Sequence, residues 1–308
     1  MTEPARSLNT LGSLGLDAKT LSTHEFQGGC LVWLRVMPTA HDLGGTRLAR
    51  DLVIEETGVV ALLRVRNPAA HDILIPSDLM LDGGKQARVV ERSVIVPAHG
   101  DIDLPVRCVE AGRWKARDAS TAQTFTVSPS ASTDSREHFT QLRQRSYHAR
   151  ASYDLDQSEV WTHVASELRR HDVDSETTSY TAILARRERQ LEHARQLEVH
   201  APREANGVAV VRHLGATWIE AFPSSDYVET MVPSFVADLL EGAPCDDSWN
   251  CATSRLDAAI RKLRAAELIT VPTPRGTGGQ SFAVDADGVA GSLLLHDGRL
   301  AHLATRVA

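Results

Sequence analysis

The sequence predicts an α+β protein, built from an N-terminal antiparallel β unit, central helices and a C-terminal mixed α/β lobe that ends in a β-hairpin. Short apolar runs separated by Gly, Pro and Asn turns fill residues 30–108, as is typical of antiparallel strands. Two stretches between residues 156 and 199 repeat apolar residues at helical spacing. An Asp297-Gly298 dipeptide joins the last two apolar runs and is a strong hairpin signal.

Composition narrows the class of protein. The chain has 308 residues, of which 42% are hydrophobic, so it can bury a sizeable core in one large domain or two smaller ones. Its net charge of −7 argues against a protein that coats nucleic acid, because such proteins carry a broad excess of Lys and Arg. The cysteines, at positions 30, 108, 245 and 251, form no C-x2-C pair, and no apolar run follows the polar opening residues. We therefore expect a soluble cytoplasmic protein with no signal peptide and no membrane contact.

Changes in composition divide the chain into four predicted parts. Residues 1–28 lack a clear pattern and contain several glycines, so we expect a weakly structured N-terminal segment. Residues 29–117 form a β-rich domain, and residues 118–153 form a polar connector with few large apolar residues. Residues 154–308 form a helical and α+β lobe packed on the first domain.

Six strands are predicted in the first third. The last of them alternates Ile102, Leu104, Val106 and Cys108 with polar residues at a period of two, which indicates one buried face. The predicted strands cover residues 30–37, 52–55, 59–65, 73–81, 88–96 and 102–108.

The polar connector has two interpretations. As a solvated linker it would order only in part on the surface, and we favour this reading. Alternatively, its basic residues with interleaved aromatic rings would suit a phosphate or a nucleic-acid strand. The residues concerned are Arg136, His138, Arg143, Arg145, His148 and Arg150, with Phe139, Tyr147 and Tyr153.

Four helices and two pairs of strands are predicted after the connector. The first helix is capped by Asp156 or Ser158, and its apolar stripe includes Val160, Val164 and Leu168. A second helix covers residues 178–199, and its charged face is read as solvated. Strands at 208–211 and 218–222 precede a helix that begins after Pro223, then a helix at 256–268 and the hairpin strands 289–295 and 300–305.

Two segments define the candidate binding site. The first is Asp82-Gly83-Gly84-Lys85-Gln86-Ala87-Arg88, where glycines allow positive φ and let the backbone approach a ligand. The second is Cys108-Val109-Glu110-Ala111-Gly112-Arg113-Trp114, at the end of the next strand but one. Antiparallel pairing would bring the two segments to the same edge of a sheet.

The side chains of these segments suit a phosphorylated ligand. Lys85 and Arg88 are expected on phosphates, Gln86 on a ribose or amide, and Arg113 with Trp114 on a base. A carboxylate among these cations, Glu110, would stay ionised and either hold them in place or act as a base. The competing interpretation is a structural turn in which Arg88 and Glu110 pair and Trp114 covers the core.

Other motifs are weaker. Residues 276–281 are rich in glycine but lack the Gly-Lys-Ser/Thr ending of a P-loop and precede a strand, which favours a flexible hairpin or gating loop over a nucleotide site. The histidines show no metal-binding spacing, and His296 and His302 beside the hairpin turn are expected to be a satisfied pair. Cys108 could pair with His99, but its period-two position predicts a buried, inert thiol. No metal site is predicted, and the cofactor is left unassigned.

The two binding segments resemble the ADP-ribosylglycohydrolase- and rhodanese-phosphatase-associated protein domain family, formerly a domain of unknown function. The resemblance rests on Gly83-Gly84-Lys85-Gln86-Ala87-Arg88, Val96-Pro97-Ala98 and Pro105-Val106-Arg107-Cys108-Val109-Glu110-Ala111-Gly112-Arg113-Trp114. It extends through Asp156-Gln157-Ser158-Glu159-Val160-Trp161, Glu220-Ala221-Phe222 and Ala301-His302-Leu303, so it covers most of the chain. Ala87 stands where the family has Asn, and Asp78-Leu79 stands where it has a Gly-Glu pair.

The resemblance implies a role in ADP-ribose, NAD or RNA-end metabolism. The leading hypothesis is recognition of an ADP-ribose-like or other phosphorylated nucleotide, with Gly83, Gly84, Lys85, Gln86, Arg88, Arg113 and Trp114 as ligand-binding residues. An alternative is a hydrolase or transferase with Glu110 as general base and Asp82 or Asp78 as its partner. A third hypothesis is an assembly subunit that binds protein partners through the 178–199 helix and the connector. The sequence leaves the choice between enzyme and binding protein open.

Overall fold

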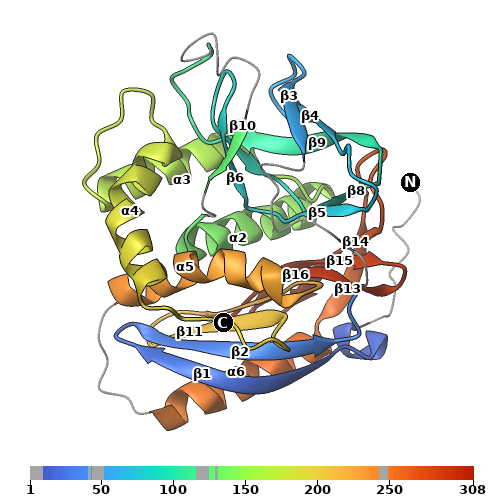
Figure 1. Ribbon diagram of the computed structural model, residues 1–308, viewed down its shortest axis with the longest axis vertical. Coiled ribbons are helices and arrows are strands. Elements are labelled where there is room, and N and C mark those ends of the chain that lie inside the picture. The colour runs from blue at the N-terminus through green and yellow to red at the C-terminus, as the bar shows by residue number, and fades with distance from the viewer. Residues whose placement is uncertain (1–9, 41–42, 44–51, 116–124, 129–130, 243–248) are drawn as a thin grey trace.

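The computed structural model describes residues 10–40, 43, 52–115, 125–128, 131–242 and 249–308, and it confirms the α+β class (Figure 1). A large antiparallel sheet has eight strands in the described part of the chain. In sheet order they are β1 (Asp17–Phe26), β2 (Gly29–Met37), β11 (Gly207–Arg212), β12 (Thr217–Ala221), β16 (Arg299–Val307), β15 (Val289–His296), β14 (Gln280–Ala286) and β13 (Glu267–Val271).

A second sheet and a strand pair form the upper layer of Figure 1. The sheet runs β10 (Phe125–Ser128), β6 (Met80–Gly83), β7 (Arg88–Val90), β9 (Asp101–Cys108), β4 (Leu62–Arg66) and β3 (Val53–Glu56). The strands β5 (Ile73–Ile75) and β8 (Val94–Val96) pair only with each other among the described strands.

Helices cover both faces of the large sheet. Figure 1 shows α5 (Ser225–Glu241) on one face and α6 (Trp249–Ala265) on the other, with α2 (Thr133–Arg150) between the two sheets. The helices α3 (Gln157–Arg170) and α4 (Tyr180–Gln196) complete the middle layer beside α2, and a 3-10 turn, η1 (Leu11–Leu14), packs near α6.

Burial on both faces explains the continuous apolar run of β2. Leu31 and Trp33 belong to the core beneath α5, whereas Cys30, Val32 and Leu34 belong to the core beneath α6. Successive strand residues point to opposite faces, so a sheet covered on both sides needs apolar residues at every position.

One strand of the predicted β-rich domain belongs to the large sheet. The strand β2, predicted to belong with the β-rich first third, pairs instead with β1 and β11 of the large sheet. Strands of the first third are therefore divided between two sheets. Pairing between segments about 180 residues apart leaves no signal in local periodicity, so the sequence predicted the strand correctly but not its partner. The proposed domain boundaries themselves stay a prediction.

The N-terminal segment is more ordered than expected over the part that the structure describes. Residues 17–26 form β1, which pairs with β2 along its whole length and was wrongly expected to be weakly structured. The strand lies at the edge of the sheet and carries many exposed polar side chains, including Lys19 and Glu25. Edge strands with polar residues lack the apolar pattern by which a strand is recognised.

The expectation of a polar connector over residues 118–153 is wrong for α2. This helix is capped by Ser132, whose side chain accepts a hydrogen bond from the Ser135 amide, and much of it is buried. Its basic residues Arg136 and Arg143 are buried in ion pairs with Glu220 and Asp78 rather than exposed. A helix that buries paired charges has a polar sequence, so composition alone predicts a linker. Residues 118–124 and 129–130 of the connector lie outside the described residues.

The other predicted helices are confirmed, with the largest shift at α6, which begins at Trp249 rather than at residue 256. Asp156, one of two proposed caps, accepts hydrogen bonds from the amides of Ser158 (2.9 Å) and Glu159 (3.3 Å) at the start of α3. The last predicted helix ends at Ala265 rather than residue 268, because β13 begins at Glu267. In the described part of the chain, no helix combines the length and the apolar character that a membrane crossing requires.

Two histidines at the contact between α2 and α3 make stability depend on pH. The His163 ring stacks on His138 with 4.2 Å between ring centres, and its Nε2 lies 2.9 Å from Ser135 Oγ. Burial, together with the charge of His138, lowers the pKa of His163 to about 4. In the unfolded chain His163 is therefore protonated below about pH 6.5, whereas in the folded chain it is protonated only below about pH 4.

We expect the free energy of unfolding to fall by roughly 2–3 kcal/mol as the pH drops from 6.5 to 4, through this histidine alone. His163→Gln, which keeps a polar side chain, should flatten that part of the stability profile in urea titrations. The same substitution at the exposed His200 provides the matched control. An unchanged slope in His163→Gln would contradict the assignment.

Candidate functional site

The Gly-Gly turn between β6 and β7 needs glycine for two reasons. Gly83 has φ 140° and Gly84 has φ 52°, a region that other residues rarely adopt. A Cβ atom on Gly84 would also lie 2.4 Å from Phe125 Cζ and 2.5 Å from Glu56 Oε1. The same Glu56 oxygen accepts a hydrogen bond from the Lys85 amide at 2.8 Å, so the turn is closely held.

Antiparallel pairing brings the two sequence segments together. Arg88 of β7 lies opposite Cys108 of β9, which places Glu110 and the residues after it beside the glycine turn. The predicted site residues therefore lie together at one end of the sheet. They are Gly83, Gly84, Lys85, Gln86, Arg88, Glu110, Arg113 and Trp114. Asp82 precedes the turn in β6, opposite Thr126 of β10.

Glu110 is the buried centre of this cluster. Its Oε1 accepts hydrogen bonds from Arg113 Nε (2.9 Å) and Thr177 Oγ1 (2.8 Å). Its Oε2 accepts from Arg113 Nη2 (2.7 Å) and the Ala87 amide (3.0 Å). Burial by itself would raise the pKa of Glu110, but these donors together lower it below its ordinary value. The carboxylate is thus a fixed anion with both oxygens engaged.

Arg113 and Gln86 also face inward. Arg113 Nη1 donates to the carbonyl oxygens of Gly84 (2.9 Å) and Lys115 (2.8 Å), so its guanidinium is used within the protein. Gln86 Nε2 donates to the Glu110 carbonyl at 2.7 Å, and Cys108 Sγ donates to Gln86 Oε1 at 3.0 Å. Burial raises the pKa of Cys108, which agrees with its role as a thiol donor and with the predicted buried cysteine.

The outward part of the cluster is a tryptophan whose ring lies near two cations, the part-exposed Lys85 and the buried Arg88. Trp114 is 49% exposed. Lys85 Nζ lies 5.4 Å from the ring centre, and Arg88 Cζ lies 6.0 Å from it. Arg88 is fully buried, and its Nε and Nη2 have no hydrogen-bond partner among the described residues, although Nη2 lies 3.7 Å from Glu56 Oε1. We call Lys85, Arg88 and Trp114 the Trp114 surface.

Other sequence candidates lie away from this surface. Asp78 forms a buried ion pair with Arg143. The 276–281 loop is fastened to β8 through the Gly278 amide, which donates to the Ile95 carbonyl at 3.0 Å. His296 lies 3.4 Å from Asp72, whereas His302 is buried with different partners, so the two histidines do not form the expected pair. Within the described residues, no three His, Cys, Asp or Glu side chains are placed to hold a metal ion.

A buried polar relay, which sequence reasoning did not assign, links the two sheets. Ser93 Oγ, in the link between β7 and β8, lies 2.6 Å from His302 Nδ1 in β16. His302 Nε2 lies 3.0 Å from Oε1 of Glu220 in β12. The other oxygen of Glu220 accepts hydrogen bonds from Arg136 and from Trp218 Nε1, the latter at 2.9 Å. Glu220 and His302 belong to two of the segments that resemble the family, 220–222 and 301–303. This resemblance was the one sequence feature that pointed to the relay residues.

The direction of the hydrogen bonds in this relay follows from its chemistry. Burial would raise the pKa of Glu220, but Arg136, His302 and Trp218 lower it, so the group is an anion and only accepts. His302 Nε2 must then carry a proton, which leaves Nδ1 as an acceptor when the ring is neutral. Ser93 consequently donates its hydroxyl proton to Nδ1 and accepts at 3.0 Å from the Ser77 amide.

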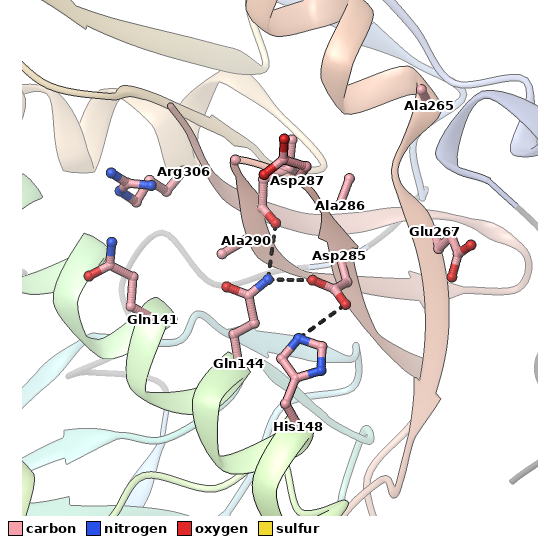
Figure 2. A pocket seen from close by; sticks show the side chains of 12 residues that line it. Gln141, Gln144, His148, Ala265, Glu267, Asp285, Ala286, Asp287, Ala290 and Arg306 are labelled. Carbon is pink, nitrogen blue, oxygen red and sulfur yellow. Dashed lines mark hydrogen bonds and ion pairs between the residues drawn. The ribbon is translucent and has the colours of Figure 1, made fainter.

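A cavity of about 610 Å³ lies between α2 and strands β13–β16 (Figure 2). Gln144 Nε2 donates to Asp285 and to the Val289 carbonyl, and His148 Nε2 lies 3.3 Å from the second Asp285 oxygen. Its lining includes the carboxylates of Glu267, Asp285 and Asp287. The excess of negative charge opposes an anionic ligand, so a phosphorylated molecule suits the Trp114 surface better than this cavity.

Comparison with known proteins agrees with the motifs. Residues 37–305 match the family model of the ARG and Rhodanese-Phosphatase-superfamily-associated Protein domain, ARPP-1. No curated protein matches the chain, and neither does any solved structure. The matched region includes the glycine turn, Glu110, Trp114, Glu220 and His302. The chain therefore belongs to the ARPP-1 family, as the motifs at residues 83–88 and 105–114 predicted.

Proposed function

We propose that this protein recognises an ADP-ribose-like or other phosphorylated nucleotide at the Trp114 surface. The observation that carries the proposal is a half-exposed tryptophan with two cations against its ring, beside a turn that requires glycine. An aromatic face stacks on a base, and a lysine beside it attracts a phosphate. The family description, which names an association with ARG, the ADP-ribosylglycohydrolase, supports an ADP-ribose context.

Direct contacts with the ligand are assigned to fewer residues than the sequence analysis expected. Lys85 and Trp114 are the members that reach solvent. Gln86, Arg88 and Arg113 are buried, so we assign them to holding the turn and, for Arg88, to supplying positive potential beneath the ring. Gly83 and Gly84 give the backbone its shape. The hydrogen bonds of the turn hold the backbone from which Lys85 and Trp114 extend, which lowers the entropy cost of binding.

The buried state of Glu110 favours recognition over catalysis by that residue. A general base must accept a proton from the substrate, whereas Glu110 already accepts four hydrogen bonds and has a lowered pKa. The hydrolase alternative would need these bonds to be replaced by substrate. Binding without turnover at Glu110 is the simpler account.

Titration calorimetry with ADP-ribose tests the proposal. We expect Trp114→Ala to raise Kd by about 5- to 150-fold, because stacking on a base contributes about 1–3 kcal/mol. Lys85→Ala should weaken ADP-ribose but leave any binding of adenosine, which has no phosphate, unchanged. Lys115→Ala, at an exposed neighbouring lysine, is the matched control. A 5′-phosphorylated RNA oligonucleotide measured in parallel distinguishes an RNA end from a free nucleotide.

Two results would overturn the proposal. One is the absence of binding by the parent protein to both ADP-ribose and the phosphorylated oligonucleotide. The other is an equal Kd in the parent, Trp114→Ala and Lys85→Ala proteins.

A further inference from the structure

We propose that Ser93, His302 and Glu220 form a second functional site, in which Ser93 is the nucleophile that transfers a small uncharged acyl group from an ester to water. The site is separate from the Trp114 surface and does not depend on nucleotide recognition. Its three residues come from the β7–β8 link, β16 and β12, so the tertiary fold alone assembles them.

The geometry meets the requirements of a nucleophile, a base and an orienting group. Ser93 Oγ, the nucleophile, lies 2.6 Å from His302 Nδ1, the base, and His302 Nε2 lies 3.0 Å from Oε1 of Glu220, the orienting group. Glu220 fixes the proton on His302 Nε2 and so leaves Nδ1 ready to accept the Ser93 proton. Arg136 and Trp218 hold Glu220 from its other side, which locks the direction of the whole relay.

Ser77 provides a second, independent observation beside the nucleophile. Its backbone amide donates to Ser93 Oγ at 3.0 Å, while its own Oγ is buried and has no hydrogen-bond partner among the described residues. Ser77 is 2% exposed, and a buried hydroxyl without a partner is uncommon. The next residue, Asp78, has φ 63°, a strained conformation of the kind that accumulates at functional sites. The spare Ser77 hydroxyl is a donor for an oxyanion that develops next to Ser93.

The surroundings define the class of substrate. The Phe222 ring lies 4.9 Å from the His302 ring, and Leu74, Ile95 and Leu294 belong to the same buried core. Ser93 is 6% exposed, against 1% for His302 and 0% for Glu220, so the nucleophile is the member nearest to solvent. Apolar surroundings and the low exposure of Ser93 favour a short, uncharged acyl group such as acetyl.

The reaction balances without a further reagent. Ser93 Oγ forms a bond to the acyl carbon as its proton moves to His302 Nδ1, and the Glu220 carboxylate stabilises the resulting imidazolium. The ester C–O bond breaks, and the alkoxide leaves with the proton from His302. Water then attacks the acyl-Ser93 ester with His302 as base, which releases the acid and restores Ser93.

Two measurements on the full chain test this site. A small alkyl fluorophosphonate should label the parent protein, and peptide mass spectrometry should place the label on Ser93. Hydrolysis of p-nitrophenyl acetate should fall by about 1,000-fold or more in Ser93→Ala. Ser77→Ala should lower kcat by about 10-fold or more through the lost oxyanion donor. Ser281→Ala, which removes another buried hydroxyl that has no hydrogen-bond partner in the described part of the chain, should change neither readout.

The labelling experiment needs no variant, so it decides the question even where a substitution prevents folding. An unlabelled Ser93 in the parent protein would overturn the proposal and leave the relay as a link between the sheets. Turnover that persists in folded Ser93→Ala would overturn it as well.

Discussion

Glu220→Ala is expected to lower the free energy of unfolding by about 3–5 kcal/mol, because it leaves the buried Arg136 charge without its carboxylate. The substitution also removes the acceptors of His302 and Trp218 Nε1. Buried donors that lose their partners carry the full cost of removal from water. Urea unfolding followed by far-UV circular dichroism measures the change.

A double-mutant cycle shows whether the loss comes from the pair. Glu220→Leu combined with Arg136→Met should be less destabilising than Glu220→Leu alone, because the double variant leaves no buried charge unpaired. Asp101→Ala, which breaks the exposed pair with Arg64, is the control and should cost far less than Glu220→Ala, because water screens this pair. Equal costs for Glu220→Ala and Asp101→Ala would show that the relay does not hold the sheets together.

Glu110→Ala is expected to lower the free energy of unfolding by about 3–5 kcal/mol as well, because it leaves the buried Arg113 guanidinium without its carboxylate. It also removes the acceptor of the Ala87 amide and of Thr177 Oγ1. We expect the residues around Trp114 to loosen, with a shift of tryptophan emission in the folded protein. Thermal and urea unfolding of Glu110→Ala, beside the exposed control Glu159→Ala, provide the comparison.

This variant separates the two readings of the glycine-turn site. If Glu110 holds the turn, stability and nucleotide affinity fall together. If Glu110 is instead a general base, Glu110→Gln would stay within about 1 kcal/mol of the parent protein and lose turnover while it still binds. That second outcome would contradict the positioning role.

The sequence predicted that the glycine turn at residues 83–88 and the segment 108–114 lie at the same edge of a sheet, and the structure brings them together. Positive φ at Gly83 and Gly84 is a local requirement, and period-two alternation in β9 is a local pattern, so both are visible in the amino acids. Antiparallel pairing of β7 with β9 passes over β8, which pairs with β5, so this pairing depends on the folded sheet and not on a local turn. Other local signals predicted Asp156 as one of two candidate caps of α3, and the final β15–β16 hairpin.

The burial of the arginines was not predicted from the sequence. Arg88, Arg113, Arg136 and Arg143 all suggest an exposed basic surface in the sequence, yet each is buried against a carboxylate or a carbonyl. Their partners lie between 3 and 84 positions away along the chain. Whether an arginine faces solvent or a buried carboxylate depends on those partners and not on its neighbours.

The sequence by itself determined the α+β class, the family, most of the helices and strands, and the turn on which Lys85 and Trp114 lie. Only the tertiary structure decided that β2 joins the C-terminal strands, that residues 133–150 form a buried helix, and that Ser93, His302 and Glu220 meet. Local features arise from the conformational preferences of adjacent residues. Contacts across 82 to 209 positions exist only once the two sheets and α2 have packed together.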